Sequence, residues 1–249
     1  MKIVVTGIGG RMGSSIARIT DSDPEVKIVG LVEKKGHPLV GAHLYGIEIV
    51  DDLSSVINTC DCLIDFTTPV ATIENVDIAF SVKKAIVIGT TGFSPDQMAH
   101  IKEASKHIPI LCSSNMSFGM NVLFKILPLL SKELFDFDVE LIEAHHRNKI
   151  DAPSGTAKRL LEALGVEGPH KIVYGRKGND KRKKGEIGVF SIRGGDIVGD
   201  HTLIFAGDGE KIEITHSVTS RDCFAYGTIK AAKFIVKKER GLYSMLDVI

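Results

Sequence analysis

The sequence predicts an α/β protein with a Rossmann-type parallel-sheet nucleotide domain and a second α+β domain with a mostly antiparallel sheet. Three observations lead to this prediction. Apolar strands alternate with helical segments over the first 116 residues, a glycine-rich turn joins the first strand to the first helix, and the later strands follow one another without helices. We place the nucleotide domain at 1–116, joined by 222–249, and the second domain at 117–221.

The first domain is predicted from short apolar runs separated by helical spacing. The predicted strands cover 3–5, 26–32, 62–66, 85–88 and 110–113. The predicted helices cover 52–58, 69–83 and a segment that starts with Ser94 as cap and Pro95 at its first position. Continuous apolar strands separated by helices are typical of a parallel sheet that is covered on both faces.

The pattern changes after a long helix predicted over 118–135. Strands are predicted at 139–143, 188–193, 202–205 and 211–215, and a final helix at 224–238. The later three strands have no helix between them, which favours antiparallel pairing. The segment Lys177–Gly185 contains five basic residues and two glycines, and we interpret it as a mobile, solvated loop.

A glycine turn follows the first strand as Gly7-Ile8-Gly9-Gly10-Arg11-Met12-Gly13. Glycines at such a turn let the backbone approach a pyrophosphate at the helix N-terminus. The second strand ends in Glu33, 20 residues after Gly13, where an acid can accept hydrogen bonds from ribose hydroxyls. An ordinary strand–helix connection and a solvated strand end are the alternatives for these two features.

The segment Glu143–Ala157 holds the densest chemistry of the chain. His145 and His146 can exchange protons near neutral pH, and Lys149 can hold a carboxylate or donate a proton. Ser154-Gly155-Thr156 leads into a helical run, so free backbone N–H groups should face this region. A cationic wall beside a helix N-terminus predicts a site for a small carboxylate.

The histidine pair has two other interpretations. Surface histidines without a function are common. A metal site made of His145, His146 and Asp151 is disfavoured, because adjacent residues of a strand point to opposite faces. We therefore expect no metal ion.

Composition excludes several classes of function. The 31 basic and 31 acidic side chains cancel, so no overall field attracts nucleic acid or an anionic membrane. The longest apolar runs are far below the roughly 20 residues of a membrane span. The four cysteines show no metal-binding spacing and suit reduced thiols. We expect a cytoplasmic protein with neither nucleic acid nor a membrane as partner.

These motifs resemble those of the 4-hydroxy-tetrahydrodipicolinate reductase (dihydrodipicolinate reductase) family of lysine and diaminopimelate biosynthesis. The matching blocks occur in order along nearly the whole chain. They are 7–13, 89–92, 114–117, 143–157, 193–202, 205–207, 214–216 and 220–221.

The resemblance implies an NAD(P)H-dependent oxidoreductase that reduces a cyclic dicarboxylate imine, uses NADH and NADPH, and forms a homotetramer. It implies His145 and Lys149 as the acid groups. The substrate contacts that it implies are His146, Lys149, Gly155, Thr156 and Arg221. The cofactor contacts that we predict are Gly7, Ile8, Gly9, Gly10, Arg11, Met12, Glu33, Lys34, Gly89, Thr90, Thr91, Ser113, Ser114, Asn115 and Met116.

Two alternative functions stay open at this point. Another two-domain amino-acid dehydrogenase, of the aspartate or diaminopimelate type, would share the glycine turn but should lack the block that surrounds His145. A non-catalytic NAD(P)-binding redox sensor needs the turn and Glu33, yet it has no use for a histidine and a lysine beside an anion pocket.

Overall fold

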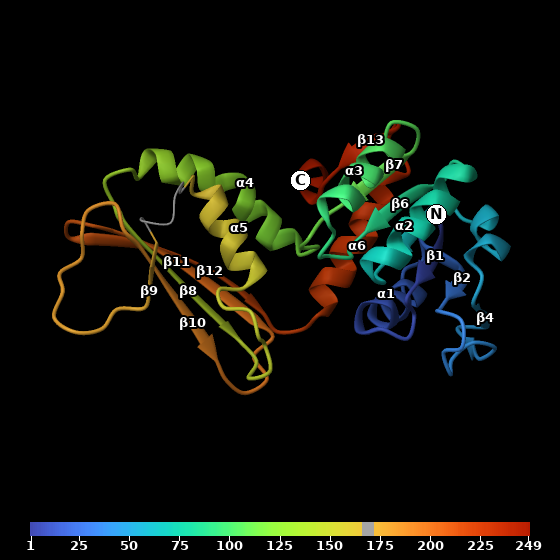
Figure 1. Cartoon of the computed structure of the whole chain (residues 1–249), viewed down its shortest axis with the longest axis horizontal. Coiled ribbons are helices and arrows are strands. Elements are labelled where there is room, and N and C mark those ends of the chain that lie inside the picture. Colours follow the sequence, from blue (N-terminus) through green and yellow to red (C-terminus); the bar gives the residue numbers. More distant parts are fainter. Residues whose placement is uncertain (166–171) are drawn as a thin grey trace. The chain divides into compact units, whose positions relative to one another are not determined.

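The chain folds into two compact units. A computed structural model describes residues 1–165 and 172–249. The first unit consists of Met1–Phe118 with Arg221–Ile249, and the second unit is Gly119–Ser220. The red C-terminal elements of Figure 1 therefore belong with the blue and green elements of the first unit.

An eight-stranded sheet forms the centre of the first unit, with the order β13-β7-β6-β5-β1-β2-β4-β3. Its strands are β1 (Lys2–Thr6), β2 (Lys27–Val32), β3 (His43–Leu44), β4 (Ile47–Val50), β5 (Cys62–Asp65), β6 (Ala85–Ile88), β7 (Pro109–Cys112) and β13 (Gly241–Tyr243). All pairs are parallel except β3 with β4. The predicted parallel sheet is confirmed.

Helices cover both faces of this sheet. They are α1 (Arg11–Asp21), α2 (Pro69–Ser81), α3 (Pro95–Ala104), α6 (Asp222–Ile235) and α7 (Met245–Val248). Ile3 of β1 packs in one apolar cluster with Ile16 of α1 and Ile229 of α6. The next residue, Val4, belongs to a second cluster with Val76 of α2 and Ile101 of α3. This alternation is the period of two that a strand buried on both sides requires.

The helix predicted over 52–58 is wrong in type. The structure has two single 3₁₀ turns there, Leu53–Ser55 and Ile57–Thr59. The Asp52 side chain caps the first turn by accepting from the Ser54 N–H at 2.9 Å. Val56 separates the turns with φ −120°, outside the helical region, so the pattern cannot propagate into an α-helix. The last predicted helix likewise ends earlier, at Ile235.

The second unit contains a five-stranded sheet with the order β12-β11-β8-β10-β9. Its strands are β8 (Asp138–His145), β9 (Ile172–Tyr174), β10 (Ile187–Arg193), β11 (Gly199–Gly207) and β12 (Glu210–Val218). Strands β8, β11 and β12 pair antiparallel, as predicted. Strand β10 pairs parallel with both β8 and β9, so these two pairs differ from the prediction. The crossover after β8 contains a helix, the usual connection between parallel strands.

Two helices lie on the same side of this sheet, α4 (Phe118–Glu133) and α5 (Gly155–Ala163) (Figure 1). Leu127 of α4, Leu160 of α5 and Phe205 of β11 are fully buried. Residues that alternate with the buried ones along β8 and β10 lie on the opposite face. That face includes Ile192, which is 51% exposed.

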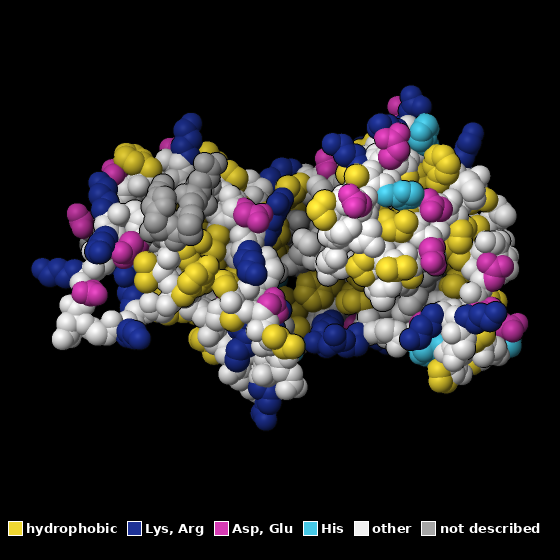
Figure 2. Space-filling model, viewed as in Figure 1, with side chains coloured by type: hydrophobic (Ala, Val, Ile, Leu, Met, Phe, Trp, Pro, Cys, Tyr) yellow, Lys and Arg dark blue, Asp and Glu magenta, His cyan; other side chains and the backbone are white. Residues whose placement is uncertain are grey.

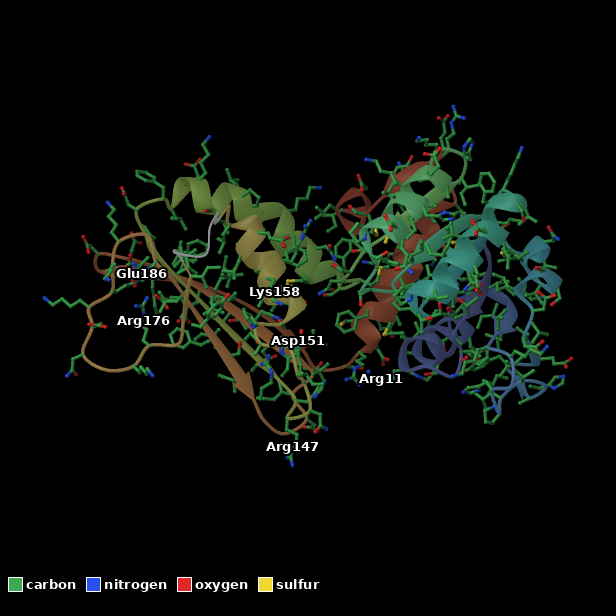
Figure 3. The ribbon with its side chains drawn as sticks, viewed as in Figure 1. Arg11, Arg147, Asp151, Lys158, Arg176 and Glu186 are labelled. Atoms are coloured by element: carbon green, nitrogen blue, oxygen red, sulfur yellow. The ribbon has the colours of Figure 1, made fainter. Side chains whose placement is uncertain are left out.

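The basic loop at 177–185 is exposed at its lysines, as expected for a solvated loop. Its arginine is anchored, because Arg182 donates to Asp138 at 2.5 Å and to Glu140 at 3.2 Å. Arg176 pairs with Glu186 at 2.9 Å across the base of the same loop (Figure 3). Arg182 therefore ties the loop to β8, and the ion pair between Arg176 and Glu186 joins the segments on either side of the loop.

Charge is mixed over the surface. Figure 2 shows basic and acidic side chains interspersed on the face in view, in keeping with 31 residues of each sign. Within residues 1–165 and 172–249, every helix falls short of the length and apolar content needed to cross a membrane.

Gly13 is required by close packing at the start of α1. A Cβ built on Gly13 would lie 2.2 Å from the Gly7 carbonyl oxygen and 2.9 Å from the Ile8 Cα. Both are backbone atoms that cannot move aside. We expect Gly13→Ala to lower the free energy of unfolding by about 2 kcal/mol, measured by urea denaturation.

The matched control for this prediction is Gly155→Ala. Gly155 also occupies the first turn of a helix, but no atom of residues 1–165 and 172–249 lies within 4 Å of a Cβ placed there. Its free energy of unfolding should stay within about 0.5 kcal/mol of the wild-type value. Equal stability of the Gly13 variant and the wild type would contradict the packing argument.

Candidate active site

The glycine turn forms a tight loop at the carboxyl end of β1. Gly7 has φ +71°, and its N–H donates to the Val32 carbonyl at 3.0 Å. The N-cap of α1 is Gly10, which offers no side-chain acceptor to the first-turn N–H groups. These N–H groups, beside Arg11 at the helix start (Figure 3), suit the phosphates of a dinucleotide.

Glu33 follows the last residue of β2 and accepts a hydrogen bond from this turn. Its Oε2 accepts from the Gly9 N–H at 2.8 Å and its Oε1 accepts from the Lys34 N–H at 2.9 Å. The His37 ring lies over the same glycine, since a Cβ on Gly9 would be 2.7 Å from His37 Cε1. Lys34 and Lys35 are exposed. An acid and an imidazole therefore lie against the glycine turn near the predicted ribose position, and two exposed lysines follow Glu33 in the chain. Sequence reasoning did not identify His37.

A second acid organises the neighbouring loops. Asp65 ends β5 and is fully buried, and its carboxylate accepts from the hydroxyls of Thr6 at 3.1 Å, Thr72 at 2.8 Å and Thr90 at 3.0 Å. Thr90 belongs to the predicted cofactor loop that follows β6. Asp65 thus fixes this loop relative to the glycine turn, and it too was missed by sequence reasoning.

The remaining predicted cofactor residues lie at the carboxyl ends of the same strands. Because β1, β5, β6 and β7 are neighbours in the sheet, the loops that follow them share one edge. Thr91 and Ser114 are exposed there, and the Ser113 hydroxyl donates to the Asn115 carbonyl at 3.0 Å. Ile8 and Met116 are buried, with 1% and 2% of their surface exposed, so only their backbone atoms could serve a cofactor.

The substrate site predicted in the second unit is built on the end of β8. Glu143 and His145 are two residues apart, so both point to the helix-covered face. Glu143 is fully buried and His145 is 9% exposed. Their contact is 2.6 Å between the Glu143 Oε2 and the His145 Nδ1. His146 follows the strand and is only partly buried.

Arg193, the last residue of β10, binds the same carboxylate with two nitrogens. Its Nη1 donates to the Glu143 Oε2 at 2.9 Å and its Nη2 to the Glu143 Oε1 at 2.7 Å. This bidentate geometry is the strong form of an arginine–carboxylate pair. The Ser154 N–H adds a fourth hydrogen bond at 3.3 Å.

His201 of β11 lies against His145, with ring centroids 5.2 Å apart at 76°. Its Nε2 is 3.1 Å from the Ser154 hydroxyl oxygen. Burial, together with His145, lowers the pKa of His201 to about 4, so this ring is neutral at pH 7. His201 therefore packs against His145 without competing for its proton.

The arrangement around Glu143 bears on metal binding. Ligand atoms of Glu143, His145 and His201 lie within 4.8 Å of one another, a spacing that a metal ion could use. However, the Arg193 guanidinium already binds both oxygens of Glu143, and a cation there opposes a metal ion. The geometry thus favours an ion-paired proton site. This trio also differs from His145, His146 and Asp151, the metal-site alternative in the sequence analysis.

Lys149 and the start of α5 complete the site. The Lys149 Nζ lies 2.7 Å from the Asp151 Oδ1, and this hydrogen bond lowers the pKa of Asp151. Ser154 caps α5 by accepting from the Ala157 N–H at 3.1 Å. Gly155 is exposed at the first turn of α5, and its backbone hydrogen bond to Asp151 also lowers the pKa of Asp151, which Figure 3 labels. A helix start beside a lysine and two histidines can bind an anion such as a carboxylate.

Arg221 is the predicted substrate contact that does not belong to the second unit. It is the N-cap residue of α6 and falls in the first unit. Its contact with substrate stays a prediction.

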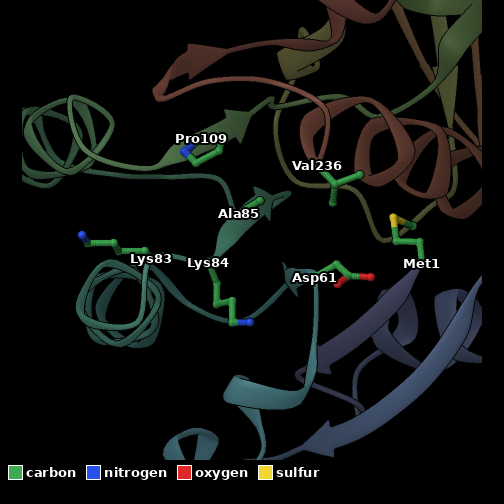
Figure 4. A pocket seen from close by; sticks show the side chains of 7 residues that line it. All are labelled: Met1, Asp61, Lys83, Lys84, Ala85, Pro109 and Val236. Atoms are coloured by element: carbon green, nitrogen blue, oxygen red, sulfur yellow. The ribbon is translucent and has the colours of Figure 1, made fainter.

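A separate hollow of about 530 Å³ lies at the amino ends of the parallel strands, lined by Met1, Asp61, Lys83, Lys84, Ala85, Pro109 and Val236 (Figure 4). Ligands of open α/β sheets bind at the carboxyl ends of the strands. This hollow is at the opposite edge from the glycine turn, and we assign it no role.

Known proteins are similar to this chain over its whole length. The family model of the dihydrodipicolinate reductase N-terminus matches residues 1–116, and that of the C-terminus matches residues 119–249. The 4-hydroxy-tetrahydrodipicolinate reductase of Geotalea uraniireducens is 46% identical, with 100% of this chain and 98% of that protein covered. The reductase of the same name from Aquifex aeolicus is also 46% identical, with the same coverage.

Solved structures show the same fold. A dipicolinate-bound dihydrodipicolinate reductase from Paenisporosarcina sp. TG-14 has a TM-score of 0.83 at 22% identity and covers 100% of this chain and 99% of that one. A DAP dehydrogenase of C. glutamicum reaches a TM-score of 0.58 at 14% identity, with 99% and 93% covered, and this likeness concerns the fold alone. With both family models and close relatives matched from end to end, the chain belongs to the dihydrodipicolinate reductase family.

Proposed function

We propose that this protein reduces 4-hydroxy-tetrahydrodipicolinate to tetrahydrodipicolinate with NADH or NADPH, as a step of lysine and diaminopimelate biosynthesis. The nucleotide binds to the first unit and the dicarboxylate to the second. The observation that carries the proposal is the buried histidine His145, placed beside Lys149 and the N-terminus of α5 in a chain of this family. A nucleotide sensor would have no use for that arrangement.

The chemistry divides between cofactor and protein. Loss of the 4-hydroxyl group as water gives the unsaturated dihydro ring. When bound, the nicotinamide would supply hydride to one carbon of this ring, and the protein supplies a proton to the adjacent carbon, which gives tetrahydrodipicolinate. In this proposal His146, Lys149, the backbone N–H groups of Gly155 and Thr156, and the Thr156 hydroxyl hold one carboxylate. Lys149 is already oriented in this region by its ion pair with Asp151.

His145 is the proton donor in this proposal. Burial lowers its pKa, Glu143 raises it, and Lys149 and Arg193 lower it, with a net shift below the ordinary value. The ring is therefore mostly neutral at pH 7 without substrate. A bound dicarboxylate brings two negative charges near the ring. These charges raise the pKa of His145, so the ring becomes protonated when substrate is bound.

The assembly and location that we propose follow from the family. We propose a cytoplasmic homotetramer formed through the sheet of the second unit. The open face of this sheet supports this, because Ile142, Phe190 and Ile192 lie there, on the side opposite the buried Leu141 and Val189. Apolar side chains on a sheet face that no helix in the described part of the chain covers suit contact with a second copy.

The first prediction for this function concerns His145. With freshly made product of dihydrodipicolinate synthase as substrate, the wild type should oxidise NADH, followed by loss of nicotinamide absorbance. His145→Gln should lower kcat by roughly 10²–10⁴-fold while the Kd for NADH stays unchanged. Lys149→Ala should lower kcat and also raise KM. A wild-type kcat in the His145 variant would remove this residue from the mechanism.

The next prediction concerns the carboxylate pocket. Pyridine-2,6-dicarboxylate carries two carboxylates on a planar ring that the nicotinamide cannot reduce. We expect it to inhibit competitively with substrate, and Thr156→Val and Arg221→Ala should each raise the inhibition constant about tenfold or more. Lys158→Ala, an exposed cation on the same helix, is the control and should leave it unchanged. Competition with the nucleotide alone would place the anion elsewhere.

A further prediction concerns the choice of nucleotide. Glu33 can accept from both ribose hydroxyls of NADH but repels the 2′-phosphate of NADPH, whereas Lys34 and Lys35 attract that phosphate. We expect kcat/KM values for the two nucleotides within about tenfold, or 1.4 kcal/mol. Lys34→Gln with Lys35→Gln should shift the ratio towards NADH, and Glu33→Ala towards NADPH. A wild-type preference above a hundredfold would mean that other residues decide.

A further inference from the structure

We propose that Glu143, held by Arg193, is the positioning residue that keeps the Nδ1 proton of His145 directed into the protein and reserves its Nε2 for the substrate. This inference rests on the proposed role of His145 as proton donor. It assigns a role to a buried ion pair that the sequence did not single out.

The hydrogen bonds of Glu143 determine the tautomer of His145. An ionised carboxylate can only accept, so the 2.6 Å contact requires a proton on the His145 Nδ1. The other ring nitrogen, Nε2, then carries the proton that can be transferred. It faces the Gly199 backbone, where a Cβ would lie 3.1 Å from it. The glycine thus leaves space beside the reactive nitrogen.

Arg193 keeps the carboxylate ionised although it is fully buried. Burial raises the pKa of Glu143, but hydrogen bonds from Arg193 and from His145 outweigh this effect and lower it. The Arg193 Nη2 also donates to the Asp151 carbonyl at 2.6 Å. One guanidinium thus fixes both the acid behind His145 and the segment that carries Lys149.

The charged and titratable groups around His145 come from every neighbouring element. Glu143 lies on the same strand, Arg193 ends β10, His201 lies on β11 and Lys149 lies in the following loop. Burial and the two cations lower the pKa of His145, and among these groups Glu143 alone raises it. Removing the Glu143 charge should therefore move the pKa of His145 further down.

The proton step balances with this arrangement. The imidazolium of His145 gives its Nε2 proton to the substrate carbon next to the one that receives hydride, and the N–H bond electrons stay on Nε2. The nicotinamide is oxidised and the substrate is reduced. His145 is left neutral, with the proton on Nδ1 still donated to Glu143, and Nε2 takes a new proton from solvent.

The test is the pH profile of Glu143→Gln. An acid catalyst loses activity as pH rises through its pKa. A lower pKa of His145 therefore moves the alkaline limb of the kcat/KM profile to lower pH. We expect a displacement of one pH unit or more, and a kcat about 10²-fold below wild type at pH 7.5. The Kd for NADH should be unchanged. Glu143→Asp keeps the charge and should return the limb towards its wild-type position.

Glu140→Gln is the matched control. Glu140 lies on the same strand and, like Glu143, is paired with arginine: its partners are Arg176 at 3.2 Å and Arg182 at 3.2 Å. Among the described residues it makes no hydrogen bond or ion pair with His145. Its pH profile should match the wild type. The proposal would be overturned if Glu143→Gln lowered kcat/KM by the same factor at every pH and did not shift the pH profile. That result would indicate a purely structural role for Glu143.

A second measurement separates this inference from the proposed reaction. Nitrogen-15 NMR of the histidine rings, with His145 assigned through His145→Gln, reports tautomer and pKa without any substrate. We expect the Nδ1-protonated form in the wild type and a lower pKa in Glu143→Gln. An Nε2-protonated neutral ring in the wild type would overturn the proposal, even if the reductase activity is found. The expected tautomer without turnover would instead refute the proposed function alone.

Discussion

A carboxylate that is buried must be satisfied by donors from several segments, and the Glu143–Arg193 pair shows what this requirement does to the second unit. The pair joins β8 to β10, and the Ser154 N–H brings in the start of α5. Leaving such a charge unpaired would cost about 3–5 kcal/mol, so these segments are held in one geometry. This pair orients the His145 ring, and the proposed chemistry uses the Nε2 atom on the other edge of that ring.

The first unit meets the same requirement without a cation. Asp65 is surrounded by hydroxyls and by the Asn75 amide, at 2.5 Å, so its neighbours are neutral donors. Several hydrogen bonds to this carboxyl group replace the stabilisation that a guanidinium provides elsewhere. Both units therefore place an acid at the carboxyl end of a strand and use it to align loops. In one unit the aligned loops suit a nucleotide, and in the other they suit a carboxylate.

Local signals in the sequence were sufficient for part of this structure. The period of two in β1, the cap at Ser94 and the glycine turn each depend on neighbouring residues, and each is found as predicted. The parallel pairing of β10, and the approach of Arg193 and His201 to Glu143, depend on strand register. Register joins residues about 50 positions apart, and no short pattern encodes it. His37 was missed for a different reason, because a turn residue after a strand carries no periodicity.

The period of two along β8 also limits how this protein can change in length. Glu143 and His145 share the covered face only while the count of residues from the buried Leu141 stays even. One residue inserted or deleted between Leu141 and Glu143 would turn the imidazole of His145 to the open face and leave Arg193 without its acid. The exposed loop at 177–185 has no such constraint between its anchored ends. Evolutionary insertions and engineered tags should therefore be accepted there and rejected in β8.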